Sequence, residues 1–314
     1  KYQFQLIQAI RNFFNSEEFI DVLTPPMVEN PGMETHIHPF QIHSVHKNKT
    51  GPLYLHTSPE FHMKKLLAEV EEFQKIFTIS YCFRDEPTSP FHRSQFIMLE
   101  WYRKNERYEK IMQDMENLIR YSQDFFKESS LLKNKIESFP QVTIQELFEE
   151  ELNINILNFL DTDDLKEKIQ KDFKDVPLPD AKCSWDDYYF LLFLNKIEPL
   201  LTNYPYLLLK EFPAPLSALS TIKKTDPRVC ERFEVYMSGV EICNCFNELT
   251  SYDEQTRRFK IQSKEKMDLY NYELAWPTEF MQVLDNGYPP SAGIALGVER
   301  LLLSLIKTEN PFYK

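Results

Sequence analysis

The chain of 314 residues has only six glycines, and it lacks both glycine-rich loops with which the commonest nucleotide-binding folds hold phosphate. Neither a G-x-x-x-x-G-K-[ST] segment nor a G-x-G-x-x-G segment occurs in it. If this protein uses ATP, it must therefore bind the phosphates with another structural device.

Cysteine is also scarce: the five residues are odd in number and show no C-x-x-C spacing. This argues against a disulfide framework and a zinc site, and is typical of free thiols in a reducing cytoplasm. The histidines form no H-E-x-x-H pattern, and His36-x-His38 would need a third metal ligand that the sequence does not indicate. No apolar run approaches about eighteen residues, so we expect no membrane span, and the first residues do not resemble a signal peptide.

Acidic side chains outnumber basic ones by 48 to 36, which gives a net charge of −12. Repulsion of phosphate backbones makes tRNA or DNA an unfavourable partner for such a chain, whereas a basic protein or a small cationic substrate fits it. Hydrophobic residues make up 42% of the chain, which is enough for a substantial packed core.

The first half of the chain has the periodicity of helices and buried strands. Apolar residues within 6–14 recur on one helical face, and the Pro25-Pro26 pair excludes any continuation of that helix. Residues 75–83 and 96–102 are apolar and joined by a polar loop, which predicts two strands. Residues 108–125 repeat apolar side chains at helical spacing, so a second long helix follows.

The second half begins with a more charged stretch, residues 128–205, which we expect to be an insertion of short helices and loops. Residues 232–237 and 240–246 then flank Ser238-Gly239 in the pattern of a β-hairpin. Ser251-x-x-Glu254 is typical of a capping box, and residues 293–300 pass from a strand into a helix. Long helices mixed with hairpin-linked strands predict an α+β fold with an antiparallel sheet.

Two groups of charged residues indicate chemistry. Arg84, at a strand end, can hold a phosphate with two hydrogen bonds, although a surface ion pair is the alternative. Glu234, Glu241 and Glu248 lie in an otherwise apolar segment, where carboxylates are costly to bury unless a cation compensates them. Mg²⁺ or a substrate ammonium would supply that cation, and a solvated sheet face is the alternative.

The closing segment is a third candidate. Gly293 and Gly297 bracket a short strand that leads to Arg300. Glycine permits close backbone approach to a ligand, and an arginine at a helix start can cover a nucleotide base or a phosphate. Tight packing of the helix on the sheet explains the same pattern without a ligand.

Taken together and in this order, these segments resemble the three signature motifs of the class II aminoacyl-tRNA synthetases. The opening helix and Thr24-Pro25-Pro26-Met27 resemble motif 1, residues 83–102 resemble motif 2, and residues 293–300 (GIALGVER) resemble motif 3. Residues 56–60 (HTSPE) and 241–248 (EICNCFNE) are similar to the lysine branch of the family. The resemblance covers nearly the whole chain except residues 128–205.

The resemblance implies one class II synthetase catalytic domain over residues 1–314, with an antiparallel sheet flanked by helices and a homodimer formed through motif 1. It also implies that the N-terminal anticodon-binding OB domain is absent. Within the lysine branch the chain is most similar to the paralogues that modify elongation factor P. These carry alanine where lysyl-tRNA synthetases carry glycine, here Ala295, and they prefer (R)-β-lysine to α-lysine.

The same resemblance implies which residues bind ATP, Mg²⁺ and substrate. ATP would be bound by Arg84, Asp85, Glu86, Arg93, Phe96, Glu241, Ile242, Gly297 and Arg300, of which Arg84, Glu241 and Arg300 would be catalytic. Mg²⁺ would be held by Glu234 and Glu241. The amino acid would be bound by Ser58, Pro59, Glu60, Glu100, Tyr102, Asn244, Glu248 and Ala295. In the family pattern Glu60 binds the amine near the carboxylate, and Glu100, Tyr102 and Glu248 bind the distal ammonium.

The loop of motif 2 departs from the family pattern. Arg93-Ser94-Gln95 stands where the family usually has Asn-Pro-Glu, and Phe91 stands where an arginine is often found. We hypothesise that Arg93 takes over the contact with the γ-phosphate.

The resemblance implies that lysine, or β-lysine, is activated as an adenylate and then transferred to a lysine side chain of elongation factor P. Two alternatives stay open at this point. One is the catalytic core of a lysyl-tRNA synthetase, which charges tRNA with α-lysine. The other is a regulatory relative that binds an amino acid or nucleotide without chemistry; the presence of Arg84, Glu241 and Arg300 argues against it.

Overall fold

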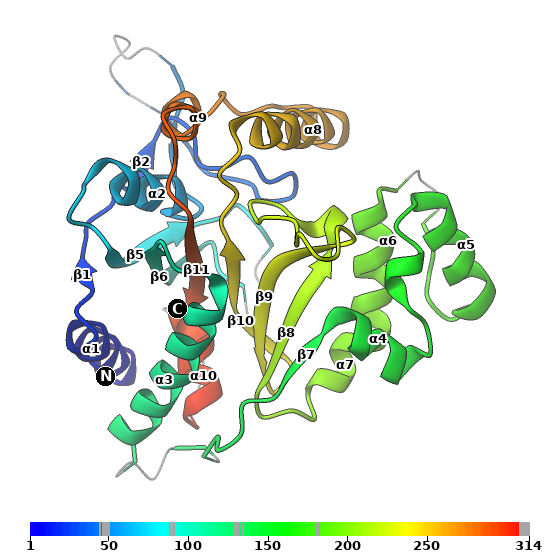
Figure 1. Cartoon of the computed structure of the whole chain (residues 1–314), viewed down its shortest axis with the longest axis horizontal. Helices are drawn as coiled ribbons and strands as arrows, with labels where there is room; N and C mark the ends of the chain where they lie inside the picture. The colour runs from blue at the N-terminus through cyan, green and yellow to red at the C-terminus, as the bar shows by residue number, and fades with distance from the viewer. Residues whose placement is uncertain are drawn as a thin grey trace. The chain divides into compact units, whose positions relative to one another are not determined.

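The computed structural model describes residues 1–43, 45, 51–87, 89, 92–127, 132–133, 135–179 and 183–307. The chain divides into two compact units (Figure 1). Unit 1 comprises Lys1–Asn134 and Glu248–Lys314, and unit 2 comprises Lys135–Asn247. The helices in the described ranges are all too short or too polar to cross a membrane.

The sheet of unit 1 is mostly antiparallel, as predicted. Its strands run in the order β1-β5-β6-β11, with β1 parallel to β5 and the other pairs antiparallel. Their bounds are Ile20–Asp21 (β1), Lys75–Phe83 (β5), Gln95–Lys104 (β6) and Ser291–Gly297 (β11). The two strands predicted from apolar runs are therefore confirmed as β5 and β6.

The central strand β6 is buried on both faces, which explains its almost continuous apolar sequence. Because side chains alternate along a strand, its odd-numbered residues face one layer of helices. The Trp101 ring packs against Phe14, with the ring centres 5.2 Å apart, and its indole N–H donates a hydrogen bond to Asp114. The even-numbered residues, which include Glu100 and Tyr102, point to the opposite face.

Three helices pack together on the odd-numbered side of β6 (Figure 1). They are α1 (Tyr2–Ser16), α3 (Tyr108–Phe125) and α10 (Val298–Leu305). The first two confirm the helices predicted from periodicity, and α10 confirms the predicted passage from strand to helix after β11. A small sheet in the order β2-β4-β3 also belongs to unit 1, with bounds Met27–Val28 (β2), Gln41–Ile42 (β3) and Leu53–Leu55 (β4).

Three further helices complete unit 1: α2 (Glu60–Glu69), α8 (Tyr252–Tyr270) and α9 (Thr278–Asp285). Ser251 caps α8, since its side chain accepts a hydrogen bond from the backbone N–H of Glu254 at 3.3 Å. Of the two hydrogen bonds of the predicted capping box, this is the one that forms. The Glu254 carboxylate instead binds Arg257 and Arg258, whose charges make stronger partners than a backbone N–H.

The sheet of unit 2 contains the predicted hairpin. Its strands run in the order β10-β9-β8-β7, with bounds Gln141–Thr143 (β7), Leu207–Pro213 (β8), Val229–Met237 (β9) and Val240–Asn247 (β10). Ser238 and Gly239 join β9 to β10 with φ angles of 51° and 82°. Both angles are positive, as a tight turn between twisted strands requires.

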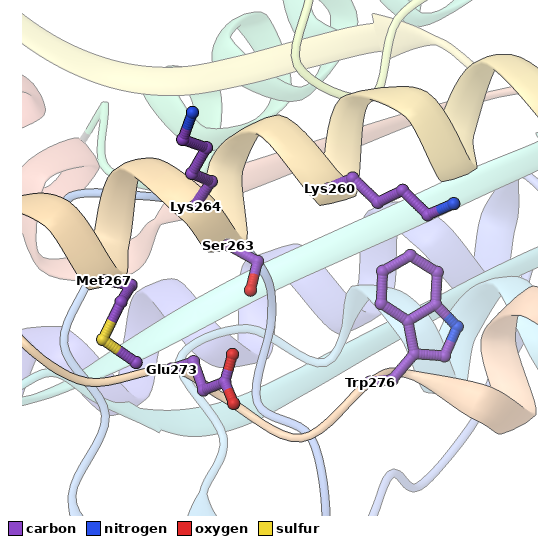
Figure 2. A pocket seen from close by; sticks show the side chains of 6 residues that line it. All are labelled: Lys260, Ser263, Lys264, Met267, Glu273 and Trp276. Carbon is purple, nitrogen blue, oxygen red and sulfur yellow. The ribbon is translucent and has the colours of Figure 1, made fainter.

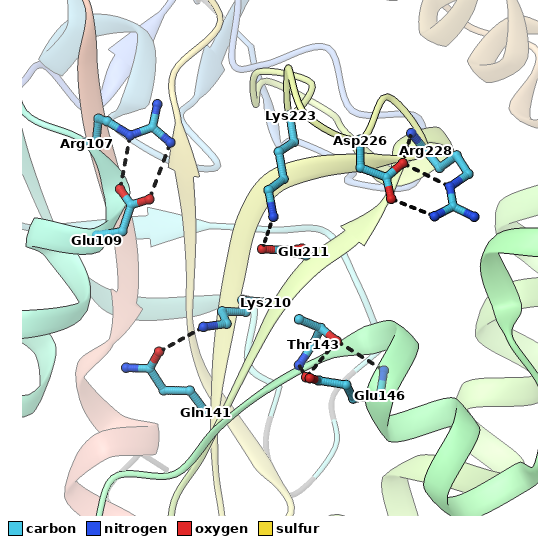
Figure 3. Close-up of polar contacts among 10 residues, drawn as sticks. All are labelled: Arg107, Glu109, Gln141, Thr143, Glu146, Lys210, Glu211, Lys223, Asp226 and Arg228. Atoms are coloured by element: carbon cyan, nitrogen blue, oxygen red, sulfur yellow. Dashed lines mark hydrogen bonds and ion pairs between the residues drawn. The ribbon is translucent and has the colours of Figure 1, made fainter.

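Helices and short helical turns cover the sheet of unit 2 and bury a core that includes Phe148, Trp185 and Tyr189. They are α4 (Ile144–Leu152), α5 (Thr162–Asp172), α6 (Trp185–Leu192) and α7 (Glu198–Leu201), with further helical turns at Ile156–Asn158, Phe193–Ile197 and Ala214–Leu216. A full capping box between Thr143 and Glu146 starts α4 (Figure 3). The insertion predicted at 128–205 contains α4 to α7, and its boundaries stay a prediction.

Candidate active site

Five of the predicted substrate residues lie together in unit 1, in what we call the acidic pocket: Ser58, Glu60, Glu100, Tyr102 and Glu248. Glu100 and Tyr102 come from the even-numbered face of β6, and Glu60 from the first turn of α2. Ser58 Oγ donates to Glu100 Oε1 at 2.5 Å, and the Tyr102 hydroxyl donates to Glu100 Oε2 at 3.1 Å. These contacts orient a buried carboxylate, the group that recognises ammonium.

A lysine that the sequence did not single out contacts two of these carboxylates. Lys64 Nζ lies 2.6 Å from Glu60 Oε1 and 2.6 Å from Glu248 Oε2, and its side chain is 2% exposed. Glu60 and Lys64 are four residues apart on α2, so they share one face of the helix. Pro59, another predicted substrate residue, is the N-cap residue that directly precedes α2.

The strand β11 allows the pocket to pack closely. Gly293 pairs with Tyr102 and Ala295 pairs with Glu100 in the antiparallel ladder. A Cβ atom at position 293 would lie 2.1 Å from Tyr102 Cε1 and 2.7 Å from Glu248 Oε1. Position 293 therefore requires glycine, and Ala295 carries its methyl group on the pocket face, because paired residues share a face.

Burial dominates the electrostatics of this pocket. Glu100 is fully buried, and this desolvation, together with the nearby charge of Glu60, raises its pKa to about 8. Burial also raises the pKa of Glu248, and the ammonium of Lys64 opposes that rise. The pKa of Lys64 is raised because its two carboxylate partners outweigh its own burial. Lys64 therefore stays protonated while it contacts Glu60 and Glu248.

Arg84, the predicted α-phosphate ligand, lies just beyond β5. Its guanidinium lies 5.2 Å from the ring centre of Phe96, a cation–π contact that supports the side chain from one side. The Nε of Arg84 is buried and has no hydrogen-bond partner among the described residues. A buried cationic donor of this kind fits an anion. The neighbouring Asp85 is held by its backbone N–H, which donates to the His38 carbonyl at 2.7 Å.

In the loop of motif 2, His92 Nε2 lies 3.1 Å from Nη2 of Arg300, which belongs to motif 3. Arg93 donates to the Ser89 carbonyl at 3.3 Å, and its proposed phosphate contact stays a prediction. Phe91, the other departure in this loop, lies outside the described residues. A Cβ at Gly297 would meet Arg300 Cδ at 3.5 Å, an ordinary contact.

Glu299 holds α10 against the sheet, and the sequence had not assigned it a role. Its two carboxylate oxygens accept hydrogen bonds from the backbone N–H of Ile97 at 3.1 and 3.0 Å, and Oε1 also accepts one from Gln3 at 3.1 Å. These bonds tie the start of α10 to β6 and α1. They therefore fix the backbone from which Arg300 projects.

A second polar group lies in unit 2, on one face of the β9–β10 hairpin. Arg232 donates to Asn244 Oδ1 at 3.1 Å and to Glu234 Oε1 at 2.5 Å, and the Tyr236 hydroxyl donates to Glu234 Oε2 at 2.8 Å. The pairing shifts register between Glu241 and Cys243. This bulge brings Glu241 and Asn244 to one face although regular alternation would separate them.

The donor chemistry of this hairpin fits Mg²⁺, which prefers one or two carboxylates together with phosphate and water oxygens. Glu234 is 5% exposed, and its pKa is raised first by burial and further by the charge of Glu241. A divalent cation would offset the repulsion between these carboxylates. Ile242, which we expected to contact ATP, is the buried extra residue of the bulge.

Three residues near these groups were missed from the sequence. Lys64 and Arg232 have a local signal, because each lies at helix or strand spacing from a predicted carboxylate, Glu60 and Glu234. Glu34 has no such signal. It interacts with Glu60, Arg84 and Lys266, and burial raises its pKa.

A shallow groove of about 410 Å³ lies on α8, apart from the predicted residues (Figure 2). It is lined by Lys260, Ser263, Lys264, Met267, Glu273 and Trp276. His36 Nδ1 lies 2.8 Å from the Tyr270 hydroxyl, and His38 Nδ1 lies 2.6 Å from the Tyr272 hydroxyl. In the described ranges no three His, Cys, Asp or Glu side chains are placed to hold a metal on their own.

Comparison with known proteins agrees with the sequence motifs. Residues 1–310 match the sequence profile of the tRNA synthetases class II (D, K and N). A protein of Pectobacterium atrosepticum named elongation factor P–(R)-β-lysine ligase is 33% identical over 310 residues, which cover 97% of this chain and 90% of that protein. Proteins of the same name from Photobacterium profundum (31% over 312 residues; 99% and 92%) and Vibrio cholerae (32% over 308; 96% and 90%) are also similar.

Proposed function

Since the chain belongs to the class II tRNA synthetases (D, K and N), we propose that it activates a lysine-type amino acid with ATP and ligates it to elongation factor P. The preferred amino acid in this proposal is (R)-β-lysine. Relatives that share about a third of its residues over nearly its full length are named for this reaction. The α-lysine substrate of a tRNA synthetase is the competing possibility.

The observation that carries the proposal is the acidic pocket. Glu60, Glu100 and Glu248 are three carboxylates in a poorly solvated site, and the Tyr102 hydroxyl lies among them. Burial of carboxylates is unfavourable unless cations accompany them. A lysine-type substrate has two ammonium groups, so it supplies the charge that such a pocket lacks.

In the first step, a carboxylate oxygen of the amino acid attacks the α-phosphorus of ATP. A P–O bond forms, the bond to the β-phosphate oxygen breaks, and pyrophosphate leaves with its electron pair. Arg84 would hold the α-phosphate, because its guanidinium, whose Nε is buried, offsets the negative charge that develops there. The pocket carboxylates would hold the ammonium groups, so that the reacting oxygen is positioned and does not diffuse.

In the second step, the neutral amine of a lysine side chain on the acceptor attacks the acyl carbon of the adenylate. A C–N bond forms, AMP leaves, and the amine loses one proton, which gives an amide. No side chain of the enzyme itself acts as a nucleophile in either step. The rate enhancement would come from positioning and electrostatics.

Glu234 and Glu241 would hold Mg²⁺, which would neutralise charge on the ATP phosphates. Asn244, fixed by Arg232, would present its amide to the substrate carboxylate. These roles follow from the family pattern and from the donor chemistry of the hairpin.

The surface around α1 supports a homodimer. Phe4, Ile20 and Leu23 are 66%, 40% and 91% exposed on α1, on β1 and beside it. Large apolar side chains exposed on this motif fit the subunit interface that motif 1 forms in the family. Light scattering of the purified protein tests the dimer, and a monomer at micromolar concentration would contradict it. The five free cysteines fit a reducing cytoplasm as the site of action.

The decisive experiment is the intact mass of elongation factor P after incubation with this protein, ATP, Mg²⁺ and either lysine isomer. We expect a mass increase of one lysyl unit, larger with (R)-β-lysine than with α-lysine, and a parallel reaction with tRNA that leaves the tRNA uncharged. Charged tRNA with an unmodified factor would instead identify a tRNA synthetase core. Arg84→Ala is the negative control, since it removes the proposed phosphate ligand.

A further inference from the structure

A lysine of α8 holds residues 35–38, a segment that lies between β2 and β3. Lys266 Nζ donates hydrogen bonds to the carbonyl of Thr35 at 2.9 Å and to that of Ile37 at 2.8 Å. It also donates to the Tyr272 hydroxyl at 3.3 Å, and Lys266 is only 1% exposed. A charged donor buried against two carbonyls of one segment fixes the backbone of that segment.

Other contacts join the same segment to α8 and to the residues after it. The Thr35 hydroxyl donates to Glu265 Oε2 at 3.1 Å, and His38 Nδ1 lies 2.6 Å from the Tyr272 hydroxyl. Lys266 is central to this group, because it binds two residues of the segment and also the tyrosine that meets a third. Its ammonium lies 5.1 Å from the ring centre of Tyr272, so the ring supports it as well.

The segment also contacts the predicted phosphate site. The His38 carbonyl accepts a hydrogen bond from the backbone N–H of Asp85 at 2.7 Å. Asp85 directly follows Arg84, whose buried Nε has no hydrogen-bond partner among the described residues. Glu34, the residue before the segment, interacts with both Arg84 and Lys266. Direct contacts therefore lead from Lys266 on α8, through the segment, to the backbone beside Arg84.

We propose that Lys266 is a positioning residue of the ATP site: it holds residues 35–38 on α8, so that the His38 carbonyl fixes the backbone beside Arg84. This inference deepens the proposed function and rests on it for the role of Arg84 as a phosphate ligand. Lys266 acts through the segment and Asp85, and it does not touch the reacting atoms.

The physical reason is that Arg84 and Asp85 lie beyond the end of β5, where the pairing of β5 with β6 no longer holds the backbone. An apolar side chain at position 266 would leave the carbonyls of Thr35 and Ile37 without their donor, and the segment could then move from α8. Arg84 would project from a less defined backbone, and a small misplacement of a ligand weakens its contact strongly.

The test is a double-mutant cycle on ATP affinity with Lys266→Met and Arg84→Ala. The Kd of ATP with Mg²⁺ is measured by ³¹P NMR titration, which reaches millimolar values, without amino acid so that no adenylate forms. Burial lowers the pKa of Lys266 to about 8, so the titrations are made at pH 7, where its ammonium predominates. Thermal melts of every variant are recorded in parallel.

Two further variants accompany the cycle. Lys264→Met is the matched control, because Lys264 lies two residues earlier on α8, on a different face of the helix. It is exposed and lines the groove of Figure 2. Tyr272→Phe removes a single hydroxyl, which contacts both Lys266 and His38. This milder variant replaces Lys266→Met in the cycle if the latter does not fold.

We expect Lys266→Met to raise the Kd of ATP about tenfold and Tyr272→Phe to raise it about threefold, whereas Lys264→Met leaves it unchanged. In the Arg84→Ala background each of the first two substitutions should change the Kd by less than about twofold, because the ligand that they position is gone. Equal effects in both backgrounds would overturn the inference. So would a Lys266→Met protein that melts earlier but binds ATP as tightly as the wild type.

The same titrations separate this inference from the proposed function. A wild-type protein that binds no ATP would contradict the proposed function, and the inference would fail with it. If Arg84→Ala weakens ATP binding while Lys266→Met and Tyr272→Phe do not, the proposed phosphate ligand stands and the role of Lys266 alone is overturned.

Discussion

Gly293 on β11 lies opposite Tyr102 on β6, and the two residues are so close that a Cβ at position 293 would lie 2.1 Å from Tyr102 Cε1 and 2.4 Å from Cδ1. The Tyr102 ring is 2% exposed and its hydroxyl binds Glu100, so the ring cannot move without disturbing the pocket. The glycine of motif 3 is therefore tied to the shape of the amino acid site.

We expect Gly293→Ala to destabilise the protein by about 1–3 kcal/mol, as overpacking of a buried site does. It should also raise KM for the amino acid, because Tyr102 and Glu248 must shift. Gly297→Ala is the matched comparison for stability, since a Cβ there would make an ordinary contact of 3.5 Å with Arg300. Thermal melts and KM values check this, and equal melting temperatures for the two variants would contradict the packing argument.

Glu100 gives the protein without substrate a pH-dependent stability. Its pKa is raised from an ordinary value near 4.5 to about 8, so the folded state holds a proton that the unfolded state releases between these values. The stabilising contribution of this carboxyl is complete below about pH 4.5, and is lost as pH rises through 8, by up to about 1.4 kcal/mol per unit.

Glu100→Gln should remove that part of the pH dependence. The free energy of unfolding of wild type and variant is measured in urea at pH 5 to 8.5. As pH rises, the stability of the variant should increase relative to that of the wild type. Glu137→Gln, an exposed carboxyl on unit 2, serves as the control. Parallel stability curves for wild type and Glu100→Gln would show that Glu100 has an ordinary pKa.

Arg232 should stabilise the β9–β10 hairpin of unit 2. Its side chain is 12% exposed and binds Glu234, Asn244 and the Leu216 carbonyl, so its loss leaves Glu234 buried without its cation. We expect Arg232→Met to cost about 3–5 kcal/mol. Arg232→Met/Glu234→Gln should recover most of this loss in urea unfolding. Additive effects of the two substitutions would mean that the residues are not coupled.

Most of the fold could be predicted from the sequence, because its strands and helices arise from local sequence patterns. The apolar runs of β5 and β6 and the positive-φ pair Ser238-Gly239 each specify an element by themselves. Alternation along β6 also predicts that Glu100 and Tyr102 share a face. The capping box predicted at Ser251 forms only in part, because the Glu254 carboxylate binds Arg257 and Arg258. Both arginines lie outside the four-residue motif from which the box was predicted.

The polar contacts of the site were harder to predict from the sequence, because they join segments that are distant along the chain. Nothing near Lys64 indicates that its ammonium meets Glu248. The bulge at Glu241 is a second case: strict alternation would place Glu241 and Asn244 on opposite faces, and one extra residue reverses this.

Ala295 should determine which lysine isomer is preferred. It pairs with Glu100 in the ladder, so its methyl group lies on the pocket face beside the carboxylate that would bind the distal ammonium. Removing this methyl enlarges the pocket next to Glu100, and one methyl or methylene group in such a pocket is worth about 10- to 200-fold in kcat/KM.

We expect Ala295→Gly to lower the ratio of kcat/KM for (R)-β-lysine over α-lysine by about tenfold, measured by AMP formation with each isomer. Ala292→Gly is the matched control, because Ala292 lies on the same strand, is fully buried and pairs with Arg103 on the opposite face. Both variants lose the same methyl group and gain the same backbone freedom, so a change in isomer preference restricted to position 295 must come from the pocket. A ratio that moves equally in both variants, or in neither, would mean that selectivity arises from other residues around the substrate.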